Sequence, residues 1–305
     1  MKRITMLLLT SLSLSVAFAP DIAAGAQKKP TTLKKHKHAK KRATARALKE
    51  TAGLVVRSAA AVVMDQATGA VLFEKNSGAV LPIASITKLM TAMVALDAQP
   101  SLKEQLAVSD EDVDSLKGTH SRLKVGTQLT REHMLRLALM SSENRAASAL
   151  SRHYPGGRNA FIAAMNHKAQ ELGLHDTRFE DPTGLTASNV SSARDLVKMV
   201  AAAHQYPLIR EFTTTTEYQV ALSGKPHMFR NTNSLVRSSS WDIGLSKTGF
   251  INEAGKCLVM QAWLNKKPTI IVLLDSLGKL TRIGDANRIK RWVENAAVPQ
   301  RLLAG

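Results

Sequence analysis

From Leu54 onward, where we expect the ordered domain to begin, the hydrophobic pattern first indicates strands and then a helix. Apolar runs over 59–64 and 70–73 flank the turn-forming residues 65–69, which predicts a buried strand with a hairpin partner. From Ser85 the apolar residues recur at helical spacing as far as Leu96. We therefore expect an N-terminal hairpin followed by a helix that is buried on most sides.

The rest of the chain shows a helical block and then a return to strands. Helical patterns extend over 131–153, 158–172 and 193–204, strand-like runs cover 243–249, 257–264 and 269–274, and an amphipathic helix follows over 281–294. This order predicts one α+β domain whose sheet is built from both chain ends, with helices packed on it. The helical block would form a second lobe, and a site is expected in the cleft between the lobes.

The first 26 residues have the layout of a secretory signal peptide. A positive start is followed by an apolar run over 4–18 and then by small residues. We place the cleavage after Ala26, because Pro20 would sit badly just beyond a cut at Ala19. A retained anchor is the alternative, but about 15 apolar residues are short for a span of roughly 20. We expect export to the periplasm.

The net charge of +18 is concentrated just after this segment. Residues 27–49 carry ten Lys or Arg and no acid, whereas residues 50–305 carry 30 basic and 23 acidic groups. We interpret residues 27–50 as a basic disordered linker. The alternative is adhesion to an anionic membrane or wall surface, with loose membrane association. Nucleic acid is not expected as a partner after export.

The domain over 51–305 must fold on its hydrophobic core. The chain has one cysteine, so no internal disulfide can form. Cys257 lies within an apolar run, and we expect it to be buried rather than reactive.

The first chemical motif is Ser85-Ile86-Thr87-Lys88 at the start of the apolar helix. Residues three apart share a helix face, so Lys88 could act as base for a Ser85 nucleophile if burial lowers its pKa. The spacing alone is weak, because it recurs at Ser121 and Ser276. Neither of those serines opens an apolar helix.

Two further motifs lie downstream. Ser142-Glu143-Asn144 falls in the helical block, where Ser142 could relay a proton and Asn144 could hold a substrate amide, although a helix cap would also explain it. Lys247-Thr248-Gly249 falls on a predicted strand, with a positive charge, a hydroxyl and a glycine that permits close approach. An edge strand with a protective lysine is the plain alternative.

In this order the three motifs form the signature shared by β-lactamases and penicillin-binding proteins. The chain resembles the low-molecular-mass penicillin-binding proteins, and among them the D-alanyl-D-alanine endopeptidases, from about residue 55 to about 295. Longer runs carry the resemblance, among them 82–93, 137–147, 153–157, 181–185 and 247–250.

The resemblance implies a β-lactamase/transpeptidase-like fold, with an antiparallel sheet flanked by helices. It also implies acylation of Ser85 with Lys88 as base, followed by hydrolysis. Ser142 would pass the proton to the leaving amine, and Lys247 would favour neutral Lys88 and draw the substrate carboxylate with Thr248. Gly249 belongs to the same binding strand, and the backbone N–H groups of Ser85 and Phe250 would form the oxyanion hole.

The implied substrates are peptidoglycan peptides, with β-lactams as covalent inhibitors. A cross-link from D-Ala to meso-diaminopimelate keeps a carboxylate beside the scissile bond, as D-Ala-D-Ala does. The motifs therefore leave endopeptidase and carboxypeptidase open, and the resemblance favours the endopeptidase.

Other classes fit less well. A class A β-lactamase would need a deacylating glutamate, and Glu171-Leu172-Gly173-Leu174-His175 lacks the expected final Asn. A non-catalytic muropeptide or β-lactam sensor could lose Lys88 or Ser142, but both are present. No H-E-x-x-H or G-x-S-x-G motif occurs, so we expect neither a metal, a cofactor nor an α/β-hydrolase.

Overall fold

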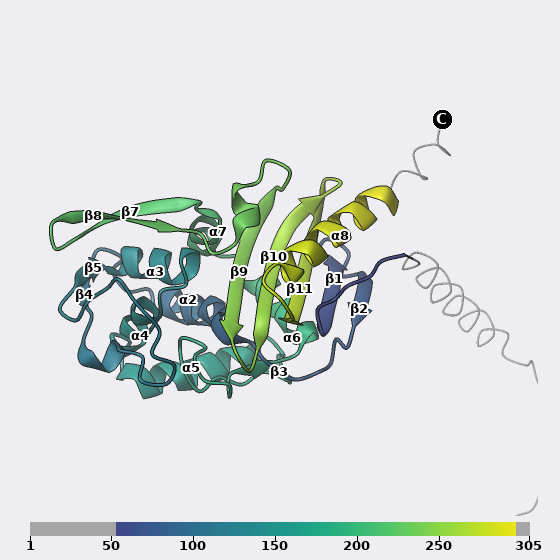
Figure 1. The fold of residues 1–305 in the computed structure, drawn as a ribbon. Helices are drawn as coiled ribbons and strands as arrows, with labels where there is room; N and C mark the ends of the chain where they lie inside the picture. The colour runs from purple at the N-terminus through teal and green to yellow at the C-terminus, as the bar shows by residue number, and fades with distance from the viewer. Residues whose placement is uncertain (1–52, 297–305) are drawn as a thin grey trace, which may run out of the picture. The chain divides into compact units, whose positions relative to one another are not determined.

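The structure is a computed structural model that describes residues 53–296 (Figure 1). The predicted signal peptide over 1–26 and the linker over 27–50 lie outside the described residues.

A five-stranded antiparallel sheet forms the centre of the domain, in the order β2-β1-β11-β10-β9. Its strands are β1 (Ala60–Asp65), β2 (Val71–Lys75), β9 (Ile243–Ile251), β10 (Gly255–Leu264) and β11 (Lys267–Ser276). The pairing of β1 with β11 joins the two ends of the chain. The prediction of a sheet built from both ends is therefore confirmed.

Both faces of the sheet are covered, which explains why its strands are almost continuously apolar. Successive side chains of a strand point to opposite faces. On β10, Cys257 and Val259 enter the core shared with the helical block, whereas Leu258 and Met260 enter the core beneath the terminal helix. Cys257 is buried, as predicted.

Apart from the helix over 207–214, which was not predicted, the helices lie close to the predicted ranges. They are α2 (Lys88–Asp97), α3 (Arg131–Met140), α4 (Asn144–Arg152), α5 (Gly157–Glu171), α6 (Ala193–Ala203), α7 (Pro207–Thr214) and α8 (Thr281–Ala296). In Figure 1, α8 crosses one side of the sheet while the helical block lies beside β9. Within residues 53–296, no helix combines the length and apolar character needed to cross a bilayer.

Several elements were not predicted. Short strand pairs form between β3 (Leu81–Pro82) and β6 (Val190–Ser191), and between β4 (Gln105–Ala107) and β5 (Gln128–Thr130). A hairpin of β7 (Glu217–Leu222) and β8 (Lys225–Arg230) follows α7. The turn residues Ser223 and Gly224 both have positive φ, which suits a tight two-residue hairpin. The serine–glycine pair was the signal that could have revealed this hairpin.

One predicted helix is divided in two. The pattern over 131–153 predicted continuous helix, but α3 ends at Met140 and α4 begins at Asn144. The connection passes through Ser142, which has a φ of 62°. A left-handed backbone is unusual for a residue other than glycine, so hydrophobic periodicity could not reveal this break.

Candidate active site

Ser85 and Lys88 lie side by side where a short 3-10 helix, η1 (Ala84–Thr87), continues into α2. The Lys88 Nζ atom donates a hydrogen bond of 2.9 Å to the Ser85 Oγ atom. Lys88 is 0 % exposed. The predicted pairing of a serine nucleophile with a buried lysine is therefore present in the geometry.

The surroundings of Lys88 set its protonation. Its Nζ atom also donates to Asn144 Oδ1 at 2.7 Å and to the carbonyl oxygen of Thr183 at 2.7 Å. Burial lowers the Lys88 pKa to about 7, although the charges of Asp181 and Glu143 oppose the change. A sizeable fraction of Lys88 is then neutral near pH 7 and can accept a proton.

Two glycines allow other segments to approach the Ser85 backbone. A Cβ atom on Gly184 would lie 2.0 Å from the carbonyl oxygen of Ala84, and one on Gly249 would lie 2.8 Å from that of Ile83. Ala84 itself has a φ of 48°, in the left-handed region. The backbone at Ser85 is therefore packed between the loop at 181–185 and strand β9. Backbone strain near a functional residue persists when the surrounding structure holds it in this way.

The second and third motifs are in direct contact. Lys247 lies on β9, the edge strand of the sheet, and is 1 % exposed. Its Nζ atom donates to Ser142 Oγ at 2.9 Å and to the carbonyl oxygen of Thr248 at 3.0 Å. The break between α3 and α4 is what turns the Ser142 hydroxyl toward the strand.

The two lysines repel one another. Burial, then the charge of Lys88 and then that of Arg282 lower the pKa of Lys247 well below its usual value. Asp181 and Glu143 favour the charged form of Lys88, whereas no such carboxylate among the described residues favours that of Lys247. Of the two buried amines, the pKa of Lys247 is therefore lowered more strongly. A carboxylate beside Lys247 would favour the protonated form of Lys247 and thereby the neutral form of Lys88.

The remaining predicted binding residues lie along the same edge. The Thr248 hydroxyl donates to Thr232 Oγ1 at 2.6 Å, and Gly249 packs against η1 as described. Phe250 is 53 % exposed, with the Lys256 ammonium 3.8 Å from its ring centroid. The backbone of β9 thus runs past Ser85, as an oxyanion role for Ser85 and Phe250 would require.

Asn144 is held from two sides. Besides accepting from Lys88, it donates through Nδ2 to Thr119 Oγ1 at 2.9 Å. The Asp114 carboxylate accepts from the backbone N–H groups of Leu116, Lys117 and Thr119, which fixes the loop that presents Thr119. A carbonyl oxygen has two lone pairs, so Asn144 keeps capacity for a substrate amide.

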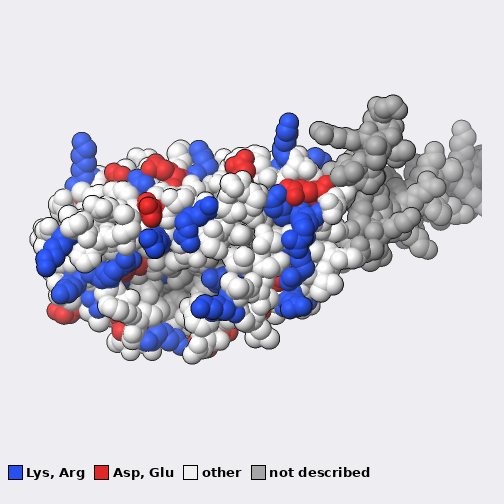
Figure 2. All heavy atoms as spheres, turned by 45° about the horizontal axis from the view of Figure 1, so that its top comes forward, with Lys and Arg blue, Asp and Glu red and all other residues white. Residues whose placement is uncertain are grey.

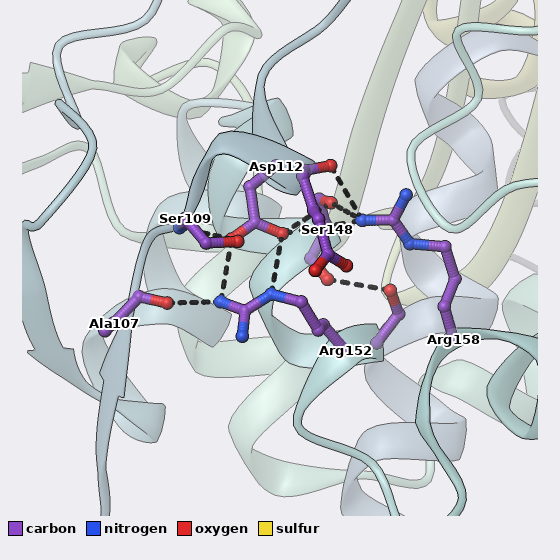
Figure 3. Close-up of polar contacts among 8 residues, drawn as sticks. Ala107, Ser109, Asp112, Ser148, Arg152 and Arg158 are labelled. Carbon is purple, nitrogen blue, oxygen red and sulfur yellow. Dashed lines mark hydrogen bonds and ion pairs between the residues drawn. The ribbon is translucent and has the colours of Figure 1, made fainter.

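A buried carboxylate anchors this loop to α4 (Figure 3). Asp112 accepts from Ser148 Oγ at 2.8 Å and from Arg152 Nη2 at 2.9 Å, and it lies 3.5 Å from Arg158 Nη2. Arg152 also donates to the carbonyl oxygen of Ala107. Since α4 begins at Asn144, this cluster ties the loop at 109–119 to the helix that carries a Lys88 partner.

Sequence reasoning missed several groups that shape the site. Asp181 folds its loop by accepting from the N–H groups of Thr183, Gly184 and Thr186. Arg282, on α8, donates to the carbonyl oxygens of Gly249 and Cys257. The 181–185 run was recognised as part of the resemblance, but nothing in the local sequence links Arg282 to the site. Among the described residues, no cluster of His, Cys, Asp or Glu could hold a metal ion.

Two Ser–Lys pairs that face one another beside an edge strand define a serine acyltransferase of the penicillin-binding type. The sequence model of the peptidase S11 family, described as D-alanyl-D-alanine carboxypeptidase, matches residues 44–278. The chain belongs to this family and is therefore a serine-type hydrolase, which confirms the resemblance seen in the sequence.

Curated relatives and solved structures agree with this assignment. The chain is 51 % identical over 243 residues to a D-alanyl-D-alanine endopeptidase of Pseudomonas aeruginosa, covering 79 % of this chain and 78 % of the relative. It is 49 % identical over 245 residues to one of Escherichia coli, covering 80 % and 79 %. The crystal structure of the Streptomyces K15 DD-transpeptidase matches with a TM-score of 0.73 at 28 % identity, covering 78 % of this chain and 97 % of that one. The predicted fold class is confirmed.

Proposed function

We propose that this protein is an exported serine D,D-peptidase that hydrolyses D-Ala–meso-diaminopimelate cross-links of peptidoglycan through an acyl-enzyme on Ser85. The observation that carries the proposal is the contact of 2.9 Å between Ser85 and a Lys88 amine whose pKa is about 7. Relatives that are about half identical over four-fifths of the chain are named as endopeptidases, which supports cross-links as the substrate.

Acylation follows from the geometry. Neutral Lys88 accepts the Ser85 proton as Oγ attacks the D-Ala carbonyl carbon, and the developing oxyanion is met by the backbone N–H groups of Ser85 and Phe250. Losing one such donor typically costs about 3 kcal/mol of transition-state stabilisation. The C–N bond then breaks, and Ser142 gives its hydroxyl proton to the leaving amine while it takes up the proton held by Lys88, which returns Lys88 to its neutral form. Water attacks the resulting ester, with Lys88 again as base.

The pair of lysines gives the substrate carboxylate a further role. In the free protein burial, and then the repulsion from Lys88, lower the Lys247 pKa. A carboxylate beside Lys247 and Thr248 favours the protonated form of Lys247. Protonated Lys247 in turn disfavours the charge on Lys88 and leaves it ready as a base. Substrates that carry this carboxylate are thereby preferred at the chemical step.

The runner-up is a D-alanyl-D-alanine carboxypeptidase. The family description favours it, and a D-Ala-D-Ala terminus offers the same carboxylate as a cross-link. The purified protein and its Ser85→Ala variant would each be given a cross-linked muropeptide dimer and a pentapeptide monomer, with products read by mass. Conversion of dimer to monomers by the wild type alone supports the proposal. Release of terminal D-Ala alone would establish the carboxypeptidase instead.

We also propose that penicillins acylate Ser85 and are released slowly, since the deacylating glutamate pattern of class A β-lactamases is lacking. Rapid penicillin turnover would contradict this.

Export to the periplasm and adhesion through the basic segment rest on the sequence of residues 1–50. On the face drawn in Figure 2, Lys and Arg side chains are more prominent than acidic ones, which suits a negatively charged wall polymer as partner. Salt-dependent sedimentation with isolated peptidoglycan, with and without residues 27–49, tests the adhesion. Equal binding by both forms would indicate a plain linker.

A further inference from the structure

A polar cavity of about 330 Å³ adjoins Ser142. It is lined by His120, Arg122, Ser141, Ser142, Glu143 and Asn144. Ser142 and Asn144 already belong to the proposed chemistry. His120 and Arg122 have no part in it, so the cavity offers room and polar contacts beyond what acylation needs.

Contacts with strand β8 fix the guanidinium of Arg122, which lines this cavity. The Arg122 Nη1 atom donates to the carbonyl oxygen of Met228 at 2.6 Å, and the guanidinium lies 3.6 Å from the Phe229 ring centroid. A guanidinium has five N–H donors, so most of them stay available while its position is fixed. Stacking of this kind reduces the entropy lost when a further partner binds.

The backbone beneath Arg122 is equally fixed. The carboxylate of Glu143, itself 8 % exposed, accepts from Ser121 Oγ at 2.7 Å and from the Arg122 backbone N–H at 3.4 Å. Glu143 lies between Ser142 and Asn144 in the second motif. The position of Arg122 is thus tied directly to that of Ser142.

We infer that this cavity receives the leaving stem peptide of a cross-link, and that Arg122 pairs with a carboxylate of that peptide beyond the scissile bond. The inference rests on the proposed function, because Ser142 is where the leaving amine takes its proton. Whatever is attached to that amine must therefore pass the cavity. The carboxylate beside the scissile bond is taken by Lys247 and Thr248, whereas a stem peptide carries further carboxylates.

This arrangement discriminates between cross-linked dimers and pentapeptide monomers. The leaving group of a pentapeptide is a single D-Ala, whose only carboxylate is already engaged by Lys247. The leaving group of a cross-linked dimer is a whole peptide that can reach Arg122. Arg122 is therefore a specificity residue for cross-links and contributes nothing to D-Ala release or to penicillin acylation.

The test measures kcat/KM of the full chain on three substrates. These are a cross-linked dimer, the same dimer with the leaving stem amidated at every carboxyl except the one beside the scissile bond, and a pentapeptide. A charge-assisted hydrogen bond is worth roughly 1.5 kcal/mol or more, which is about tenfold. We expect Arg122→Ala to lower kcat/KM about tenfold on the dimer alone, and Arg122→Lys to recover part of the loss.

The amidated dimer identifies the partner of Arg122. Wild type should lose about tenfold on amidation, whereas Arg122→Ala should process both dimers equally, as expected for two groups that interact directly. Arg230→Ala is the matched control, because Arg230 is an exposed arginine of β8 outside the cavity. It should leave all three rates unchanged.

Two results would overturn the inference while the proposed function stands. Equal losses on dimer and pentapeptide would show that Arg122 supports the fold of the site, and an unchanged rate on the dimer would show that the leaving peptide lies elsewhere. Failure of the wild type to cleave either dimer while it trims the pentapeptide would instead reject the endopeptidase function, and the inference with it.

Discussion

Replacing Glu143 by Gln should make Ser85 react faster at low pH. The Glu143 charge raises the pKa of Lys88, which burial has brought to about 7. Acylation needs neutral Lys88, so its rate rises with pH through the Lys88 pKa. Gln has the same shape and can still bond Ser121, but it removes the charge. The Lys88 pKa then falls, and the acid limb of the rate profile moves to lower pH.

The size of the effect can be approximated with Coulomb's law at the effective dielectric of a protein site. For charges separated by more than direct contact at a protein site, an interaction of about 1 kcal/mol is reasonable. This corresponds to a fall of about 0.7 in the Lys88 pKa. At pH 6 the neutral fraction would rise about fourfold, from about a tenth to about a third. At pH 9 Lys88 is neutral in both proteins, so the rates should converge.

The assay is the second-order rate of acylation by a fluorescent penicillin, followed by stopped flow from pH 5 to 9. Penicillin has no leaving stem peptide, so the cavity around Arg122 does not influence the result. Ser121→Ala is the control, because it removes the hydrogen bond to Glu143 but keeps the charge. An acid limb that stays in place in Glu143→Gln, or moves equally in Ser121→Ala, would refute the electrostatic reasoning.

Three further outcomes are expected. Lys88→Met should slow penicillin acylation by about 10²–10⁴-fold without unfolding the protein, as checked by circular dichroism, because a general base is lost; a rate near wild type would exclude Lys88 as base. Gly249→Ala should slow acylation and lower the melting temperature, since its Cβ atom would lie 2.8 Å from a carbonyl oxygen, whereas Gly78→Ala meets nothing closer than 3.7 Å and should change little. Asp112→Ala should lower the free energy of unfolding in urea by roughly 3 kcal/mol, because Arg152 and Ser148 lose their buried carboxylate partner. The control Glu180→Ala breaks only an exposed pair with Arg178 and should lower it by less than about 1 kcal/mol. Similar losses in both variants would show that the Asp112 cluster is not an anchor.

The regular elements were predictable where local patterning and burial agree. Strand β1, the helix after Ser85 and the strands β10 and β11 each bury nearly every apolar side chain. Hydrophobic spacing reports such burial directly. The β7–β8 hairpin was missed because only β7 shows apolar alternation, at Tyr218, Val220 and Leu222, whereas β8 has a single buried residue.

The chemical residues could also be named from sequence, because Ser85, Ser142 and Lys247 lie in short motifs whose residue types the chemistry requires. What the sequence could not supply was their electrostatic setting. The Lys88 pKa depends on burial and on Asp181, which is 93 residues away in the chain. The low pKa of Lys247 arises from its burial, then from the charge of Lys88 and then from that of Arg282, which lies on α8 rather than on the strand that carries Lys247.

The sequence by itself therefore determined the family, the order of the elements and the identity of the reacting groups. Only the tertiary structure decided the left-handed turn at Ser142 and the close approach of Gly184 and Gly249 to η1. It also decided the position of Arg122 in the cavity that Ser142 lines. The physical reason is the separation along the chain over which each effect acts. Periodicity and motifs express neighbours along the chain, whereas desolvation, repulsion between buried amines and steric fit depend on segments that meet only after folding.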